Sequence, residues 1–190
     1  MGESDSLVFV DIETTGASAR HGRVLEVAAL RYERGQVTQQ FATLLDPEEY
    51  VPSFITRLTG IEQQDVAGKP KFREIAGELL AVMSGAVFIA HNVWFDYRFL
   101  EHEFARVGVD FAPPLGCTVQ LSRRFNPEHR SHRLDAVIER HGIHIEDRHR
   151  ALGDAQALVE LYEKLVGQHG EALVSDKLSP RRPLAHQRSV

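Results

Sequence analysis

The sequence predicts a mixed α/β fold, in which three antiparallel strands continue into parallel strands and helices flank the sheet. The first observation is a series of three early stretches with strand composition, the last two joined by the turn residues "ERGQ". These stretches are Leu7–Val10, Arg23–Tyr32 and Gln36–Leu45. The second observation is a change from strand to helix periodicity at Phe72, after which helical and strand patterns alternate.

The later elements follow from the same periodicity. Apolar residues recur at helical spacing over Phe72–Met83, which predicts a helix. The apolar segment Ala86–Ala90 predicts a buried strand, and Asn92 is a favourable cap for the next helix. A short strand or turn is expected near Cys117. The remaining helices are expected near Val119–Phe125, near Leu134–His141 and around Ala155–Leu165.

The composition indicates a soluble globular protein. The chain has 190 residues, of which 43% are apolar and 26% charged, enough to bury a sizeable core. No apolar run could span a bilayer, and no signal peptide pattern opens the sequence. The single cysteine, Cys117, excludes an internal disulfide, so we expect a cytoplasmic location. A net charge of -5 argues against coating of nucleic acid by bulk charge but allows a small local site.

The first strand ends in "FVDIETTG", which contains two acids. Asp11 and Glu13 are two residues apart, so on a strand they share a face, with Cα atoms roughly 7 Å apart. Two neighbouring carboxylates repel unless a cation lies between them, and Mg²⁺ or Mn²⁺ prefers such oxygen ligands. A polar strand end that faces water is the alternative, which this pair of residues by itself does not exclude.

A third acid lies in "HNVWFD", directly after the buried strand at Ala86–Ala90. Open α/β sheets tend to place their sites at the carboxyl ends of strands, where His91 and Asn92 also gather. Asp96 falls in the first turn of a helix, however, where the helix dipole favours an acid for structural reasons alone.

The fourth acid lies in "HRALGDA" and leads a helical stripe that should face the core. Asp154 is in line with Leu158 and Leu165, which is unusual for a solvated acid. His149 lies five positions earlier and would be on another face of one helix, so it must sit on a preceding loop to reach the same site. The charged segment before it has no apolar period, so we expect this loop to be mobile. A surface histidine, or a zinc site built from the neighbouring histidines, is the alternative.

Together, and in this order, the three segments closely resemble the exonuclease motifs of the DEDDh family. This family comprises DnaQ-like 3′–5′ exonucleases with a ribonuclease H-like fold, among them the proofreading epsilon subunit of bacterial DNA polymerase III. The segment "RLTGI", Arg57–Ile61, resembles the family's segment that packs on the terminal nucleotide. The resemblance extends from about Leu7 to Leu165.

The resemblance implies a role for each matching residue. The acids that would hold two divalent cations, Mg²⁺ or Mn²⁺, are Asp11, Glu13, Asp96 and Asp154. His149 would be the general base, and its spacing from Asp154 is typical of the histidine subclass. The residues that would contact the substrate are Thr14, Thr15, Gly16, Leu58, Thr59, His91, Asn92 and Phe95.

The implied activity is hydrolysis that releases nucleoside 5′-monophosphates from 3′ ends of single-stranded or frayed DNA. The implied partners are such a 3′ end and, for a proofreading subunit, a DNA polymerase; no membrane is involved. A free-standing DNA repair enzyme is as open as a proofreading subunit. Three further alternatives stay open: an RNA-trimming exoribonuclease of the same superfamily, a non-catalytic nucleic-acid-binding module, and an unrelated metal-binding α/β protein. The motifs do not separate DNA from RNA.

The expected organisation is one exonuclease domain with two short ends. We expect a flexible N-terminus over 1–6, the exonuclease domain over 7–174 and a flexible basic tail over 175–190. The tail is assigned because its apolar period is lost and it contains Lys177 and several arginines.

Overall fold

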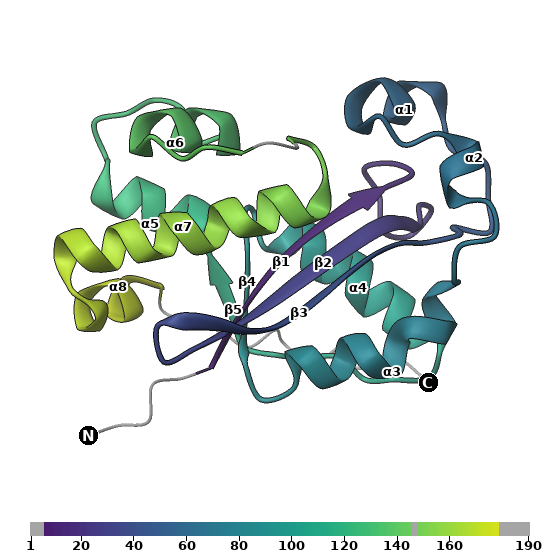
Figure 1. Ribbon diagram of the computed structural model, residues 1–190, viewed down its shortest axis with the longest axis horizontal. Coiled ribbons are helices and arrows are strands. Elements are labelled where there is room, and N and C mark those ends of the chain that lie inside the picture. Colours follow the sequence, from purple (N-terminus) through teal and green to yellow (C-terminus); the bar gives the residue numbers. More distant parts are fainter. Residues whose placement is uncertain (1–5, 146–147, 179–190) are drawn as a thin grey trace.

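A computed structural model describes residues 6–145 and 148–178, which form a five-stranded sheet between two layers of helices (Figure 1). The strands lie in the spatial order β3-β2-β1-β4-β5. Their bounds are β1 Leu7–Thr14, β2 Val24–Glu33, β3 Gln36–Leu44, β4 Val87–Ala90 and β5 Leu115–Cys117. Strands β1, β2 and β3 pair antiparallel, whereas β1 with β4 and β4 with β5 pair parallel. The predicted mixed sheet is therefore confirmed.

The helices divide between the two faces of the sheet (Figure 1). Their bounds are α1 Ser53–Thr59, α2 Gln63–Val66, α3 Phe72–Met83, α4 Trp94–Arg106, α5 Thr118–Phe125, α6 Leu134–His141, α7 Ala151–His169 and α8 Glu171–Leu178. Helices α3 and α4 pack on one face, and α5 to α8 contribute to the core on the other. No helix in residues 6–145 and 148–178 has the length and hydropathy needed to cross a membrane.

Successive side chains of β1 point to opposite faces of the sheet, and this alternation determines on which face its acids lie. Val8 and Val10 join the core with α3 and α4, whereas Leu7 and Phe9 join the core under α7. Continuing this period of two places Asp11 and Glu13 on the α7 side of the sheet.

Helices α1 and α2 were not predicted, because they have only 7 and 4 residues and thus show little periodicity. They close a small separate core in which Ile55, Ile61 and Val66 pack on Leu25 of β2. In Figure 1 this pair of helices stands beyond the ends of β1 and β2, close to the tip of β1.

The boundary expected for the basic tail at residue 175 does not agree with the structure. Helix α8 extends to Leu178, which is buried at 4% exposure. A Cβ atom added at Gly116 would lie 2.9 Å from the Leu178 side chain, so β5 and α8 approach closely only because this position is glycine. The rest of the expected tail, 179–190, and residues 1–5 of the expected N-terminus lie outside the described residues.

Candidate active site

Three carboxylates meet where β1 ends and α7 begins. Asp11, Glu13 and Asp154 each offer an oxygen, and these oxygens lie within 4.8 Å of one another. Asp154 is 4% exposed, and its Oδ1 is a buried oxygen without a hydrogen-bond partner among the described residues. Because a buried, unpaired oxygen is costly, this donor set fits a hard divalent cation.

Helix α7 positions Asp154 as the sequence pattern predicted. The helix starts at Ala151, and Asp154 lies in its first turn. Leu158, Leu161 and Leu165 on the same stripe are buried in the core over β1. Burial of this stripe turns the Asp154 carboxylate toward the acids of β1.

Asp96 lies beside this group but is not one of the three clustered carboxylates. It sits in the first turn of α4, is 3% exposed, and accepts a hydrogen bond from the backbone N–H of Ile12. Its negative charge raises the pKa of Asp11, which shows that the two carboxylates are electrostatic neighbours.

Burial and mutual repulsion favour the protonated forms of these acids. Burial raises the pKa of Asp11 well above its ordinary value, and the neighbouring carboxylates raise it further. Burial, Asp154 and Glu26 raise the pKa of Glu13 to about 8. Burial also raises the pKa values of Asp96 and Asp154. A divalent cation among the carboxylates would oppose these shifts, because it stabilises their charged forms.

His149 lies in the turn before α7, as predicted, with a left-handed backbone φ of 62°. The preceding residue, Arg148, forms ion pairs with Asp154 and with Asp135, the latter at 2.7 Å between Nη2 and Oδ1. The expectation of a mobile loop rested on the charged segment before His149, which has no core-facing apolar period. The structure instead shows polar anchors on both sides of His149, because Arg150 is also ion-paired.

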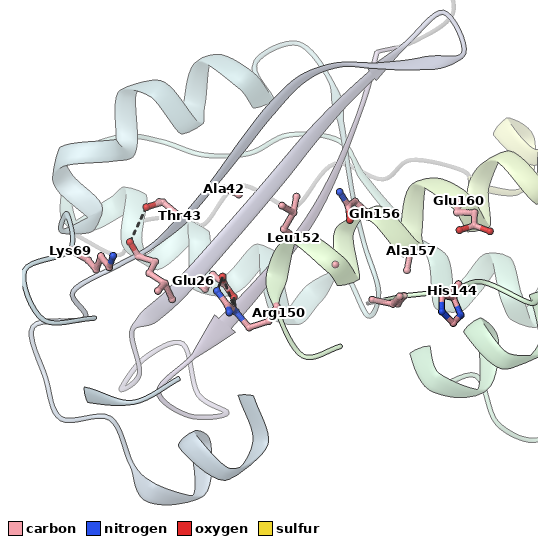
Figure 2. A pocket seen from close by; sticks show the side chains of 13 residues that line it. Glu26, Ala42, Thr43, Lys69, His144, Arg150, Leu152, Gln156, Ala157 and Glu160 are labelled. Atoms are coloured by element: carbon pink, nitrogen blue, oxygen red, sulfur yellow. Dashed lines mark hydrogen bonds and ion pairs between the residues drawn. The ribbon is translucent and has the colours of Figure 1, made fainter. Parts of the chain in front are cut away.

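The partner of Arg150 is Glu26, a buried acid in β2 (Figure 2). Glu26 lies opposite Glu13 in the register of β1 and β2. Its Oε1 is 2.7 Å from Arg150 Nη2, and its Oε2 accepts the backbone N–H of Ala151 at 2.9 Å. One side chain therefore fixes the residue after His149 and satisfies an N–H at the start of α7.

A groove of about 690 Å³ lies beside this ion pair, between β2, β3 and α7 (Figure 2). Lys69, His144 and Gln156 are among its lining residues. None of Asp11, Glu13, Asp96 or Asp154 lines it, so this groove is separate from the carboxylate cluster.

Two of the predicted substrate-contact residues, Thr14 and Thr15, form hydrogen bonds within the protein at the turn after β1. The Thr14 hydroxyl donates to the Gly16 carbonyl at 2.8 Å. The Thr15 hydroxyl donates to Glu49 and accepts the N–H of Arg23. Both threonines are buried, whereas a Cβ atom at Gly16 would meet nothing within 4 Å. Open space for a substrate therefore lies at Gly16 and not at the threonine side chains.

Of the two substrate contacts predicted on α1, one side chain is exposed and the other is buried. Leu58 is 56% exposed and so is free to contact a base. Thr59 is 5% exposed, and its hydroxyl donates to the Ile55 carbonyl and accepts the N–H of Ile61. The Thr59 hydroxyl thus stabilises the end of α1, and the expected contact of Thr59 with the last base stays a prediction.

Among the residues after β4, His91 also has a structural position. Its Nε2–H donates to the His132 carbonyl at 2.9 Å, and its Nδ1 lies 2.9 Å from the Thr118 hydroxyl. Burial lowers the pKa of His91 to about 4, so the ring is neutral near pH 7. Asn92 is exposed with a φ of 63°, and Phe95 is half-buried.

Residues 8–162 match the family model described as Exonuclease, of the RNase T type. This match covers most of the chain. The chain belongs to the exonuclease family. The predicted resemblance to DnaQ-like exonucleases is thereby confirmed.

Curated relatives carry similar sequences within much longer proteins. DNA polymerase III PolC-type from Latilactobacillus sakei is 36% identical over 170 residues, which are 89% of this chain but 12% of that protein. The 3′-5′ exonuclease DinG from Bacillus subtilis is 34% identical over 164 residues, which are 83% of this chain and 18% of DinG. The exonuclease described here therefore corresponds to a small part of each relative.

Solved structures share the fold. Escherichia coli Exonuclease I in complex with a dA16 oligonucleotide has a TM-score of 0.77 and 18% identity, covering 91% of this chain and 42% of that chain. Exonuclease X in complex with 5′ overhanging duplex DNA has a TM-score of 0.72 and 21% identity, covering 91% of this chain and 97% of that chain. The predicted ribonuclease H-like fold is confirmed.

Sequence reasoning missed two residues around the exonuclease site, Glu26 and Arg148. Glu26 could have been found, because a single acid inside the apolar run "VLEVAAL" must have a buried partner. Arg148 gave no such signal, because it lies in a segment of mixed charge where one arginine resembles any other.

Proposed function

We propose that this exonuclease hydrolyses the last phosphodiester at 3′ ends of DNA and releases nucleoside 5′-monophosphates. The observation that carries the proposal is the cluster of Asp11, Glu13 and Asp154, whose oxygens lie within 4.8 Å of one another. The similarity to DinG of Bacillus subtilis, a 3′-5′ exonuclease, supports the polarity.

The carboxylates would hold two divalent cations, Mg²⁺ or Mn²⁺. Asp11, Glu13 and Asp154 would bind one of them, and Asp96, with Asp11, would serve the second. When bound, such a pair supplies an activated water and neutralises the charge that develops on the phosphate. Binding of the cation requires that Arg148 share or release Asp154, whose Oδ1 is already available.

The side chains of the protein perform the remaining tasks. His149 takes the proton from the attacking water, since its turn lies next to the Asp154 end of α7. Leu58 packs beside the last base, and the turn at Gly16 leaves room for the 3′ end. An apolar contact of this kind accepts any base, which suits unpaired or frayed ends.

The setting of the activity is part of the proposal. Several curated relatives are DNA polymerase III PolC-type proteins, which supports DNA as substrate and a proofreading role beside a polymerase. A cytoplasmic location agrees with the single buried Cys117. RNA trimming is the second candidate function, because the carboxylate cluster acts on the phosphate and does not by itself separate DNA from RNA.

One assay tests polarity and substrate together. Single-stranded DNA and RNA, labelled at the 5′ end, are incubated with the protein and Mg²⁺. We expect stepwise shortening of DNA from an open 3′ end and no cleavage when that end is blocked. Faster shortening of RNA would favour the trimming function, and cleavage of a closed circular strand would contradict an exonuclease.

A further inference from the structure

A second, basic groove lies at the ends of β4 and β5. It has a volume of about 570 Å³ and is lined by Arg123 at the end of α5, by Arg130 and Arg133 before α6, and by His91 and Asn92 after β4. We call it the α5–α6 groove. In a chain with a net charge of -5, three arginines around one groove form a local positive site.

These three arginines have no acidic partners within residues 6–145 and 148–178. Arginines elsewhere, such as Arg23 and Arg31, are paired with Glu103 and Glu33. Of the acids in the same segment, Asp135 is paired with Arg148, and Glu128 Oε1 lies 3.2 Å from His129 Nε2. The guanidinium groups of the groove are exposed, so they are available to an anionic ligand.

The backbone that carries two of these arginines is held firmly. His91 binds the carbonyl of His132, and the Nδ1 atom of His132 lies 2.9 Å from the Ser122 hydroxyl. Arg140 donates to the Ser131 carbonyl at 2.7 Å. A ligand would thus meet a preformed wall and would not need to order a loop, which lowers the cost of binding.

The order of the strands relates this groove to the carboxylate cluster. Helix α1, with Leu58, packs on the β2 side of the sheet through Leu25, whereas the α5–α6 groove follows β4 and β5. Strand β1, with Asp11 and Glu13, lies between β2 and β4. Consider a nucleic-acid strand whose last nucleotide lies at α1 and whose terminal phosphodiester lies at these acids. If it continues in the same direction, its preceding nucleotides reach the α5–α6 groove.

We propose that Arg123, Arg130 and Arg133 bind backbone phosphates of the substrate strand on the 5′ side of the cleaved bond. This inference rests on the proposed function and adds that the substrate is a strand of several nucleotides, bound through its phosphates. Phosphate contacts of this kind carry no sequence preference and weaken with salt. A substrate without nucleotides on the 5′ side of the cleaved bond would not reach the groove.

The test is the salt dependence of kcat/KM for the triple variant Arg123→Ala/Arg130→Ala/Arg133→Ala. On a single strand of about 16 nucleotides, losing three phosphate contacts should reduce the slope of log(kcat/KM) against log[salt] by about 2. Between 50 and 200 mM salt, the wild type should therefore lose about 20-fold more kcat/KM than the variant. For a nucleoside 5′-monophosphate p-nitrophenyl ester, kcat/KM of the variant should equal that of the wild type, because this small substrate does not reach the groove.

Two matched triple variants serve as controls. Replacement of the same arginines by lysine should keep the wild-type slope, because the charges remain. Arg34→Ala/Arg73→Ala/Lys164→Ala removes the same charge from the β2–β3 turn, from α3 and from α7, and should also keep the wild-type slope. A wild-type slope in the groove variant, or loss of ester hydrolysis in it, would overturn the proposal.

Failure of the proposed function would look different, since the wild type would then cleave neither the strand nor the ester. The groove would still be tested in that case by fluorescence anisotropy of the same labelled strand. Equal salt slopes of binding for wild type and variant would contradict the inference, and a slope reduced by about 2 would support it.

Discussion

Arg150 forms a bidentate ion pair with Glu26, with 2.7 Å between Nη2 and Oε1 and 3.1 Å between Nε and Oε2. The pair joins the first part of β2 to the turn that contains His149. Glu26 is also the cross-strand neighbour of Glu13, so one carboxylate contacts the His149 turn and borders the acid cluster.

Glu26→Gln should lower both stability and activity. Glutamine can still accept the N–H of Ala151, but the charge that pairs with Arg150 is lost. We expect a loss of about 1–3 kcal/mol in the free energy of unfolding and a lower kcat, with KM little changed. Denaturant unfolding and steady-state kinetics measure these effects. The control is Lys164→Gln, which breaks the exposed Lys164–Glu160 pair and should cost less than about 1 kcal/mol. Equal effects of the two variants would contradict the positioning role.

His149→Ala should keep metal and DNA affinity but reduce kcat by roughly 10²–10⁴-fold, because a positioned base is lost. Rates measured from pH 5.5 to 9 should also change in profile, since only a neutral imidazole accepts a proton. The control is His144→Ala, which changes an exposed histidine in the separate groove beside Arg150. If His149→Ala retains the wild-type rate and profile, the base is another group.

Leu58→Ala should weaken activity without weakening the fold. Leu58 is 56% exposed, so its removal should change the free energy of unfolding by less than about 0.5 kcal/mol. Loss of its contact with the last base should lower kcat/KM about fivefold, equivalent to ~1 kcal/mol of buried apolar contact. Leu173→Ala, at a 43% exposed position on α8, is the matched control and should leave kcat/KM unchanged. Identical kcat/KM for all three proteins would remove Leu58 from the site.

Without metal, the stability of the protein should fall as pH rises from about 4.5 to about 8. The folded state raises the pKa of Glu13 from 4.5 to about 8, so in this range the folded protein binds a proton that the unfolded chain has lost. The stabilisation is complete below the lower value and is lost above the higher one. Thermal unfolding in EDTA at pH 5, 6.5 and 8.5 measures the effect. Glu13→Gln should reduce this pH dependence, and Asp11, Asp96 and Asp154, whose pKa values are also raised, should contribute the rest. Added Mg²⁺ should stabilise most at pH 8.5, and a Tm shift that is largest at pH 5 would argue against metal binding by these acids.

The parts of the fold that could be predicted are those whose periodicity is long. Strand β1 was recognisable from its apolar run and helix α7 from its helical apolar pattern. These patterns predicted that Asp11 and Glu13 share a face and that Asp154 faces the core, whereas only the family resemblance implied that the three acids meet. Helices α1 and α2 were missed because one or two turns show no clear period. Helix α8 was missed because its burial depends on Gly116, which is distant in the sequence.

The contact residues show a second limit of sequence patterns. A motif predicts that a residue lies near the site, but it does not predict the direction of the side chain. Thr59 and His91 lie where they were expected, yet their polar atoms bind the Ile55 and His132 carbonyls. The His91 bond depends on a segment 41 residues away, which no local pattern reveals.

The most direct test of the central claim is the Mg²⁺-dependent release of nucleoside 5′-monophosphates from a labelled single strand by wild type and Asp11→Asn. Asp110→Asn, at an exposed position after α4, is the matched control. We expect the wild type and the control to shorten the strand from its 3′ end in Mg²⁺ and to stop in EDTA, and Asp11→Asn to lose nearly all turnover while it remains folded. Undiminished cleavage in EDTA, or full activity of Asp11→Asn, would contradict the claim that these carboxylates hold the catalytic metal.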